Sequence, residues 1–376
     1  MGLQLDLSRY SSRAATATAR RLASRAFLTV TALLLAGLVI LFLDVHSGRG
    51  VVFIDWWVYA LASERFLAGE SLYLDVQLAG PYSLRELTPF VYPPPSAILF
   101  LPFASWPVGQ VAWIIASLAI FLSGLAAIVH RELGHVTPVV AGCILVALTL
   151  FVPLPDGRLL APFLDAVGTA NMNLALAGLL AWTWAAGERL RWLPWMAGVL
   201  AILKVFPASL ILWAVRRNGW RPLLIGLGTA ALIVVATLPI LGIEEWRRFA
   251  VALSNAELAC DGGRVSLPCL AEPLLGASGA KLAGLATGAL LLVSSVLAHG
   301  EYRAFALLTL GMMAGIPDLS QHYYLFLYVL IAIPGAAHRP AQGWPCRTLA
   351  AFVSAGGRSS VTVLPSPAMG ARHGAR

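Results

Sequence analysis

The sequence predicts an all-α, polytopic membrane protein. Of its 376 residues, 59% are hydrophobic and only 12% are charged, and the mean hydropathy is +0.79. Soluble domains carry about twice that share of charged residues, and water could not solvate the apolar surface that such a chain leaves exposed after folding. Long hydrophobic runs, rather than short alternating strands, also argue against an outer-membrane barrel. These observations exclude a soluble enzyme, a disordered chain and a collagenous one.

The first hydrophobic run, residues 26–45, has the ~20 residues that a transmembrane helix needs. The segment before it, 1–25, carries five arginines against one acid, and no small-residue cleavage site follows. We therefore interpret the run as a retained anchor behind a basic cytoplasmic tail. This topology makes 46–107 the first outer loop with its juxtamembrane helices and 243–270 the second outer loop. A basic, flexible tail is expected over 338–376.

Further hydrophobic runs are expected to cross the membrane near 108–129, 137–153, 169–187, 222–242, 278–298, 304–316 and 322–337. Two segments leave the topology open. Residues 93–104 are short for a crossing, and residues 193–215 form either one helix or two half-helices. A break at Lys204–Pro207 is plausible because proline removes a backbone hydrogen bond and restricts the residue before it. We favour 93–104 in the outer leaflet and a hairpin at 193–215, because this arrangement keeps the interhelical arginines inside.

Cofactor and metal motifs are absent from the sequence. No His/Cys spacing suggests a metal site, and neither a P-loop nor a GxGxxG motif suggests a nucleotide. Cys260 and Cys269 share the second outer loop, where an oxidising compartment permits a disulfide, although two free thiols remain the alternative. The net charge of +8 lacks an aromatic–basic platform, so we expect no nucleic-acid partner.

Asp55 is the first candidate for chemistry. It stands in an aromatic segment, Phe-Ile-Asp-Trp-Trp-Val-Tyr over 53–59, of the kind that lies at membrane interfaces. Apolar residues then recur at helical spacing: Val58, Leu61, Ala62 and Phe66. This pattern predicts an amphipathic surface helix from Asp55 to Leu67. Asp55 then serves either as the helix N-cap or as a carboxylate that projects into a partly dehydrated cleft.

Polar motifs follow along the chain in a fixed order. They are Leu67–Tyr73 (Leu-Ala-Gly-Glu-Ser-Leu-Tyr), Phe90–Pro95 (Phe-Val-Tyr-Pro-Pro-Pro), Gly168–Asn173 (Gly-Thr-Ala-Asn-Met-Asn), Lys204–Pro207 (Lys-Val-Phe-Pro) and Asp318–Tyr324 (Asp-Leu-Ser-Gln-His-Tyr-Tyr). From about residue 50 to 330, this succession resembles glycosyltransferase family 87, the polyprenol-phosphate-dependent mannosyltransferases with a GT-C fold. The family pattern is Asp…Tyr, Leu-x-Gly-x-x-x-Tyr, Phe-x-Tyr-Pro-Pro, Gly-Gln-x-Asn, Lys-x-x-Pro and a late His. The fourth element departs from it, because Thr169 replaces the glutamine and Asn173 offers a second amide.

The resemblance implies a GT-C-like catalytic domain over 26–337 with about 9–11 transmembrane helices. It implies that a polyprenyl-phosphate sugar is a co-substrate at the outer face, so that no cofactor is expected. It makes Asp55 the general base and places His322 near the sugar-phosphate of the donor. The residues expected to bind substrate are Tyr59, Tyr92, Asn171, Lys204 and Tyr323.

Chemistry supports these roles independently. Transfer from a phosphate to a hydroxyl needs one base but no strong general acid, because the phosphodiester leaves as a stable anion. A positive group stabilises that anion. An intramembrane lysine costs roughly 2.5–3.5 kcal/mol on insertion scales, which makes Lys204 a functional-site hypothesis. It contacts either the donor phosphate or an internal acid such as Asp165.

We interpret the protein as a multi-pass cell-membrane glycosyltransferase with a cytoplasmic N-terminus and an extracytoplasmic active site. It would move a hexose, with mannose favoured, to a hydroxyl of a lipid or glycan acceptor with inversion. Its expected partners are the lipid-linked donor, the acceptor and membrane lipids. Two alternatives stay open: arabinofuranosyl transfer by the same fold, and a lipid-linked sugar flippase or transporter. A transporter should carry polar groups along several spans.

Overall fold

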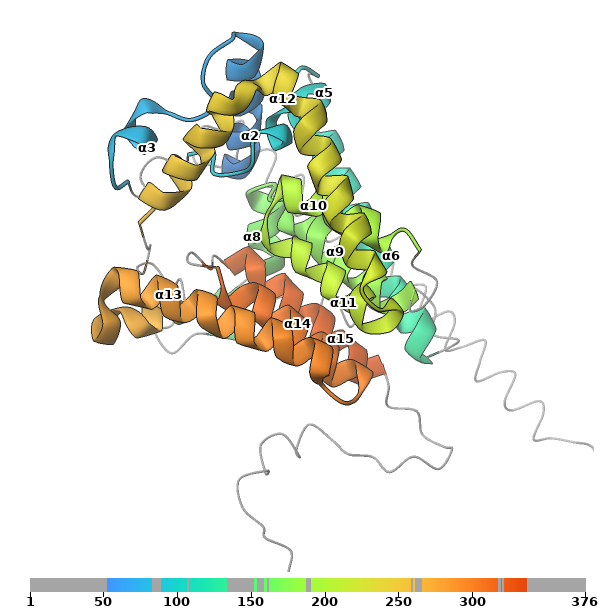
Figure 1. Ribbon diagram of the computed structural model, residues 1–376. Coiled ribbons are helices and arrows are strands. Elements are labelled where there is room, and N and C mark those ends of the chain that lie inside the picture. Colours follow the sequence, from blue (N-terminus) through green and yellow to red (C-terminus); the bar gives the residue numbers. More distant parts are fainter. Residues whose placement is uncertain are drawn as a thin grey trace, which may run out of the picture. The chain divides into compact units, whose positions relative to one another are not determined.

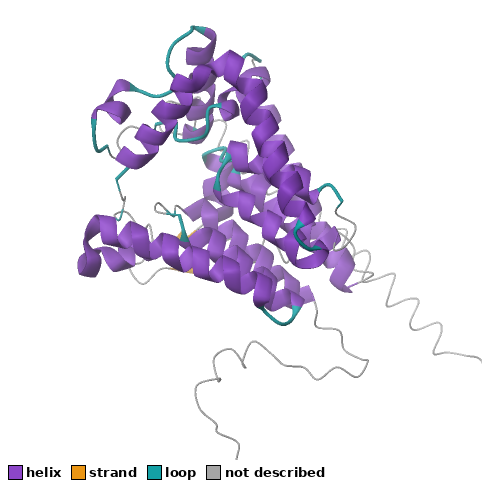
Figure 2. Cartoon of the chain, in the orientation of Figure 1, coloured by secondary structure: helices purple, strands orange, loops and turns teal. Residues whose placement is uncertain are grey.

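The computed structural model describes residues 53–82, 89–106, 108–133, 152–153, 159–160, 162–186, 191–257, 260, 266–316, 319 and 321–336. Helices dominate this part of the chain (Figure 2). Two short antiparallel strands, β1 (Val152–Pro153) and β2 (Leu159–Leu160), account for the strand residues described. The predicted all-α class is therefore confirmed. The predicted first span and both tails lie outside the described residues, as does most of the run at 137–153.

Within the described ranges, three helices are long and apolar enough to cross a membrane. They are α6 (Gly109–Leu133), α12 (Arg221–Asn255) and α13 (Leu267–Leu297), and they confirm as helical the runs predicted near 108–129, 222–242 and 278–298. Both α12 and α13 bend (Figure 1), at Gly242 and Gly276 respectively, where φ is +74° and +67°. Glycine adopts this left-handed backbone without a steric penalty, and a proline three residues earlier weakens each helix at the same place.

The remaining helices of the apolar region are shorter: α9 (Asn173–Ala186), α10 (Leu193–Leu203), α11 (Leu210–Asn218), α14 (Glu301–Ala314), α15 (Leu325–Ala336) and the single turns η2 (Phe206–Ser209) and η3 (Gln321–Tyr324). The 14 residues of α9 extend about 21 Å, less than the ~30 Å of a hydrocarbon core. The predicted break in 193–215 is confirmed, because α10 ends at Leu203 and Lys204 is extended. The segment is therefore two half-helices.

Glycines allow the helices of the bundle to approach closely. A Cβ added to Gly178 of α9 would lie 2.5 Å from the backbone oxygen of Ile120 in α6, and one added to Gly124 would lie 2.3 Å from the oxygen of Gly178. Gly288 and Gly311 make the equivalent close contact between α13 and α14. Small residues at these positions give the close backbone packing that membrane helices use in place of a hydrophobic driving force.

The segment predicted as the first outer loop contains α2 (Ile54–Leu67), α3 (Asp75–Ala79) and α5 (Pro95–Ala104). The helix predicted from Asp55 to Leu67 is confirmed, and of the two roles left open for Asp55, that of N-cap is excluded. The N-cap is Phe53, in the left-handed conformation, and no side chain caps the helix. The face of this helix that packs on the protein centres on Trp56 and Tyr59, whereas Leu61 is 50% exposed.

Helix α5 has only ten residues, about 15 Å, so it cannot cross a membrane. It packs on α2 instead: the Ser63 hydroxyl donates to the Ala97 carbonyl at 2.8 Å, and the rings of Tyr59 and Phe100 stack at 4.2 Å. This packing supports placing 93–104 within one leaflet.

The segment 243–270, predicted as the second outer loop, is more helical than expected, because α12 continues to Asn255 and α13 begins at Leu267. It contacts the segment that contains α2 and α3: the Leu72 N–H donates to Glu245 Oε2 at 3.0 Å, and the Tyr82 N–H donates to the Asn255 carbonyl at 3.1 Å. Cys260 and Cys269 form a disulfide, which decides between the two alternatives for these cysteines.

Candidate active site

A sharp turn between two helices organises the polar site. Helix α8 (Pro162–Gly168) ends there and α9 begins at Asn173. The Thr169 hydroxyl and N–H both donate to the Asp165 carbonyl, at 2.8 and 2.9 Å. Ala170 then adopts a left-handed φ of +54°, which is unusual for a residue with a side chain.

This turn also fixes the start of α2. The carbonyls of Gly168 and Thr169 accept the N–H groups of Phe53 and Asp55, at 2.6 and 3.1 Å. The first N–H groups of a helix have no partner within the helix and often bond to a capping side chain. Here two backbone carbonyls accept two of these N–H groups instead. The Asp55 carboxylate is therefore not an N-cap and is available for other contacts.

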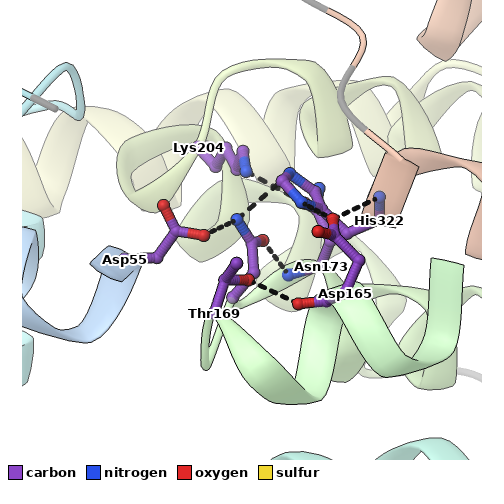
Figure 3. Close-up of polar contacts among 7 residues, drawn as sticks. Asp55, Asp165, Thr169, Asn173, Lys204 and His322 are labelled. Atoms are coloured by element: carbon purple, nitrogen blue, oxygen red, sulfur yellow. Dashed lines mark hydrogen bonds and ion pairs between the residues drawn. The ribbon is translucent and has the colours of Figure 1, made fainter. Parts of the chain in front are cut away.

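The Asn171 amide links Asp55 to His322. Asn171 Nδ2 lies 2.7 Å from Asp55 Oδ2 and 3.1 Å from His322 Nε2. The Asn171 amide is 2% exposed, and its Oδ1 accepts the backbone N–H of Asn173 at 2.8 Å. The second Asp55 oxygen points away from the cluster (Figure 3), and Asp55 itself is only partly buried.

Asp165 holds His322 from the other side. A single carboxylate oxygen, Oδ2, lies 2.9 Å from His322 Nδ1 and 3.1 Å from its backbone nitrogen. The imidazole side chain is 10% exposed and the carboxylate 31%. Asp165 was considered from the sequence only as a partner for Lys204, and here it contacts His322.

Lys204 lies at the break between α10 and η2 and is 7% exposed. Its Nζ donates to Asn173 Oδ1 at 2.9 Å and lies 4.9–5.4 Å from the ring centroids of Tyr92, Phe206 and Tyr323. Aromatic faces attract a cation at this distance. Asn173 Nδ2 is buried without a hydrogen-bond partner among the described residues.

Two of the three tyrosines predicted to bind substrate, Tyr92 and Tyr323, lie against Lys204, and the third, Tyr59, contacts Tyr92. Tyr59 is fully buried and its hydroxyl donates to the Tyr92 hydroxyl at 3.1 Å. Burial raises the pKa of both phenols, and the negative charge of Asp55 raises that of Tyr59 further. Both phenols therefore stay protonated at neutral pH, and neither can act as the base.

The structure brings together all seven residues predicted for the site. Sequence reasoning missed the contribution of Asp165 to His322 and that of Asn173 to Lys204. One signal could have found them: polar residues at 165, 169, 171 and 173 interrupt an otherwise apolar stretch, and buried polar side chains of membrane proteins gather at functional sites. Among the described residues, no three His, Cys, Asp or Glu side chains converge as a metal site would need.

Fold and site together define an integral membrane protein with a charged, partly buried site at the ends of apolar helices. The model of glycosyltransferase family 87 matches residues 90–316, more than half of the chain. The chain therefore belongs to glycosyltransferase family 87 and is a membrane glycosyltransferase, which confirms the resemblance noted in the sequence. The matched region contains Tyr92, Asn171 and Lys204, whereas Asp55 and His322 lie outside it. Neither the curated proteins nor the solved structures gave a significant match.

Proposed function

We propose that this glycosyltransferase moves a hexose, with mannose favoured, from a polyprenyl-phosphate sugar to a hydroxyl of a lipid or glycan acceptor, with inversion. One observation carries the proposal: four distant segments of the chain bring Asp55, Asn171, Lys204 and His322 to one place. This set offers a base, hydrogen-bond donors and a cation, which are the groups that transfer from a phosphate requires.

Asp55 is the proposed base. Asn171 occupies one carboxylate oxygen and orients the group, while the other oxygen points away from the cluster, where an acceptor hydroxyl can approach (Figure 3). As the acceptor oxygen bonds to the anomeric carbon, its proton passes to Asp55. The bond from that carbon to the phosphate oxygen breaks, and the polyprenyl phosphate leaves with the electron pair. Attack opposite the phosphate inverts the anomeric centre.

Lys204 is the proposed group that stabilises the departing phosphate. Its ammonium is held by Asn173 and by aromatic rings in a setting that excludes most water, and a charge contact is stronger where water is excluded. The amide of Asn173 that accepts the Lys204 hydrogen bond also carries the buried Nδ2, which has no hydrogen-bond partner among the described residues. An anion beside Lys204 would find positive charge that is already in place, as transition-state stabilisation requires.

The proposed site faces the extracytoplasmic side of the cell membrane. Helix α6 begins next to the site, where the Trp113 indole donates to the Ala170 carbonyl, and its last turn carries Arg131, which pairs with Glu301 at 3.4 Å. Glu301 also pairs with Arg217 at 2.8 Å. Arginines thus gather at the helix ends opposite the site. By the positive-inside rule that end is cytoplasmic, which supports an outer location for Asp55.

Reconstitution tests the proposal. The purified protein, in liposomes containing extracted acceptor lipids, receives radiolabelled polyprenyl-phosphate mannose, with the arabinofuranose donor in a parallel sample. We expect mannose on a new lipid or glycan, and Asp55→Asn should lower turnover by roughly 10²–10⁴-fold while donor binding persists. Asp75→Asn, an exposed acid of α3, is the control and should transfer normally.

Three results would contradict the proposal. Label that only redistributes across the bilayer would indicate transport. Preferential use of the arabinofuranose donor would show that the transferred sugar is arabinofuranose rather than mannose. Near-normal transfer by Asp55→Asn would remove Asp55 from the role of base. The outer location is tested separately, by labelling Trp57→Cys, a residue that is 59% exposed, with a membrane-impermeant maleimide on intact cells.

A further inference from the structure

The proton of His322 can be placed from the hydrogen bonds around Asn171. The backbone N–H of Asn173 can only donate, so the Asn171 atom 2.8 Å from it must be the oxygen. The Asn171 NH₂ group therefore faces Asp55 and His322, and its two hydrogens serve one acceptor each. His322 Nε2 must then accept a hydrogen bond, which leaves the ring proton of the neutral imidazole on Nδ1.

Asp165 is the group that favours this tautomer. Its Oδ2 lies 2.9 Å from His322 Nδ1 and accepts the proton placed there. The same oxygen accepts the backbone N–H of His322 at 3.1 Å, so one carboxylate oxygen fixes both the chain and the ring. The carbonyl of Asp165 in turn accepts two hydrogen bonds from Thr169, in the turn that holds α2. Asp165 therefore contacts both His322 and the turn that holds the start of α2.

A continuous chain of hydrogen bonds results. It runs from Asp165 to His322 Nδ1–H, then from the Asn171 amide to His322 Nε2 on one side and to Asp55 Oδ2 on the other. If the His322 proton moved to Nε2, that N–H would face the Asn171 N–H, and two donors would oppose each other. The amide would then have to turn or move, and Asp55 would lose the hydrogen bond that orients it.

We infer that Asp165 is a positioning residue for glycosyl transfer, which acts through the His322 tautomer and the Asn171 amide on the carboxylate of Asp55. This inference rests on the proposed function, because it assumes that Asp55 is the base. Carboxylates that orient a metal-bound imidazole typically change activity by 10–100-fold when they are replaced, and we expect an effect of the same order for Asp165. The loss should fall on kcat, because Asp165 holds the base rather than the donor, while KM for the donor should change little.

Three variants of the full-length protein test the inference in the reconstituted transfer assay. Asp165→Ala should lower kcat by roughly 10–100-fold. Asp165→Asn keeps an oxygen that can accept both hydrogen bonds, so its loss should be smaller. In a His322→Ala background, adding Asp165→Ala should cost nothing further, because a residue that acts through His322 has no effect in its absence. Asp75→Ala is the matched control, since it removes an exposed acid outside the site.

A spectroscopic measurement separates this inference from the proposed function. Nitrogen chemical shifts of ¹⁵N-histidine-labelled protein distinguish protonated from unprotonated ring nitrogens, and the His322 signal among the seven histidines is the one missing in His322→Gln. We expect protonated Nδ1 in the wild type and in Asp165→Asn, and a mixed or reversed signal in Asp165→Ala. If the wild type transfers no sugar, the proposed function fails, and these spectra still decide whether Asp165 fixes the tautomer.

Several results would overturn the inference. Wild-type His322 protonated on Nε2 would remove its basis. Folded Asp165→Ala with wild-type kcat would show that the contact does not position the base. Full additivity of the two alanine substitutions would show that Asp165 acts elsewhere. If Asp165→Ala does not fold, Asp165→Asn decides instead: a large loss of kcat while His322 Nδ1 stays protonated would refute the role assigned to Asp165.

Discussion

Replacing Lys204 by methionine is the sharpest test of how the donor is held. Methionine keeps an unbranched side chain of similar length and removes the ammonium group, with its charge and its hydrogen-bond donors. A hydrogen bond to a charged group contributes about 1.5–3 kcal/mol, so loss of a phosphate contact should weaken donor binding by roughly 10- to 150-fold. We expect a smaller change for an acceptor, because Asp55 rather than Lys204 is placed to meet it.

The same substitution has two opposing effects on stability. It removes the hydrogen bond to Asn173 Oδ1, on a side chain that is fully buried, and an unsatisfied buried acceptor costs about 1–3 kcal/mol. It also removes an ammonium that is only 7% exposed, which favours folding. These terms offset each other, so Lys204→Met should fold.

Equilibrium binding of radiolabelled polyprenyl-phosphate sugar to the reconstituted protein measures the effect, with thermal unfolding as the check on folding. Lys281→Met is the matched control, because Lys281 is the other lysine of the chain and its Nζ contacts only the Ala256 carbonyl among the described residues. Its donor affinity should equal that of the wild type. A folded Lys204→Met protein with unchanged donor affinity would refute the phosphate contact.

Three further predictions concern stability. Gly178→Ala should lower the free energy of unfolding by roughly 1–3 kcal/mol in a denaturant titration, because the added Cβ would lie 2.5 Å from a backbone oxygen of α6, whereas Gly228→Ala meets open space and should not. Replacing Cys260 and Cys269 by serine opens a covalent loop of sequence separation 9 and should destabilise the segment 243–270 by about 2–3 kcal/mol, seen as faster proteolysis there. Burial raises the pKa of Tyr73, so the folded state binds the phenol proton more tightly than the unfolded state does. The free energy of unfolding should therefore keep its full value below about pH 10 and decrease above it, and this decrease should be less steep in Tyr73→Phe.

Each of these predictions has a contrary outcome. Equal unfolding free energies for the two glycine variants would mean that α6 and α9 are not packed as described. Unchanged proteolysis of the double serine variant would show that other contacts stabilise the segment 243–270. A Tyr73→Phe protein with the same alkaline decline as the wild type would assign that decline to other groups.

Much of the helical framework could be predicted from local sequence. Long apolar runs indicate helices because the backbone must satisfy its own hydrogen bonds in lipid, and α6, α12 and α13 follow the predicted runs. The break at Lys204 was also readable, since Pro207 lacks an N–H and restricts the residue before it. The bends at Gly242 and Gly276 were not predicted, although each combines a glycine with a proline three residues earlier.

The site was predicted in its members but not in its contacts. Aspartate is a common N-cap residue at the start of a helix, so the sequence allowed that role for Asp55. In the structure, the backbone carbonyls of Gly168 and Thr169, more than 100 residues away, accept the N–H groups at the start of α2 instead. The partner of Lys204 is likewise the Asn173 amide and its aromatic neighbours, while Asp165 contacts a histidine 157 positions along the chain. Sequence spacing carries no information on such pairs, because they depend on how separate helices meet.

By itself, the sequence determined that this chain is a helical membrane protein, that polar residues at fixed intervals resemble one glycosyltransferase family, and that a helix must end near Lys204. These follow from hydropathy, residue order and proline geometry, all of which are properties of short segments. Only the tertiary structure decided which amide meets which carboxylate and where the His322 proton lies. Hydrogen bonds select partners by distance and direction, and those are set once the turn at 168–171 has joined α2, α8 and α9.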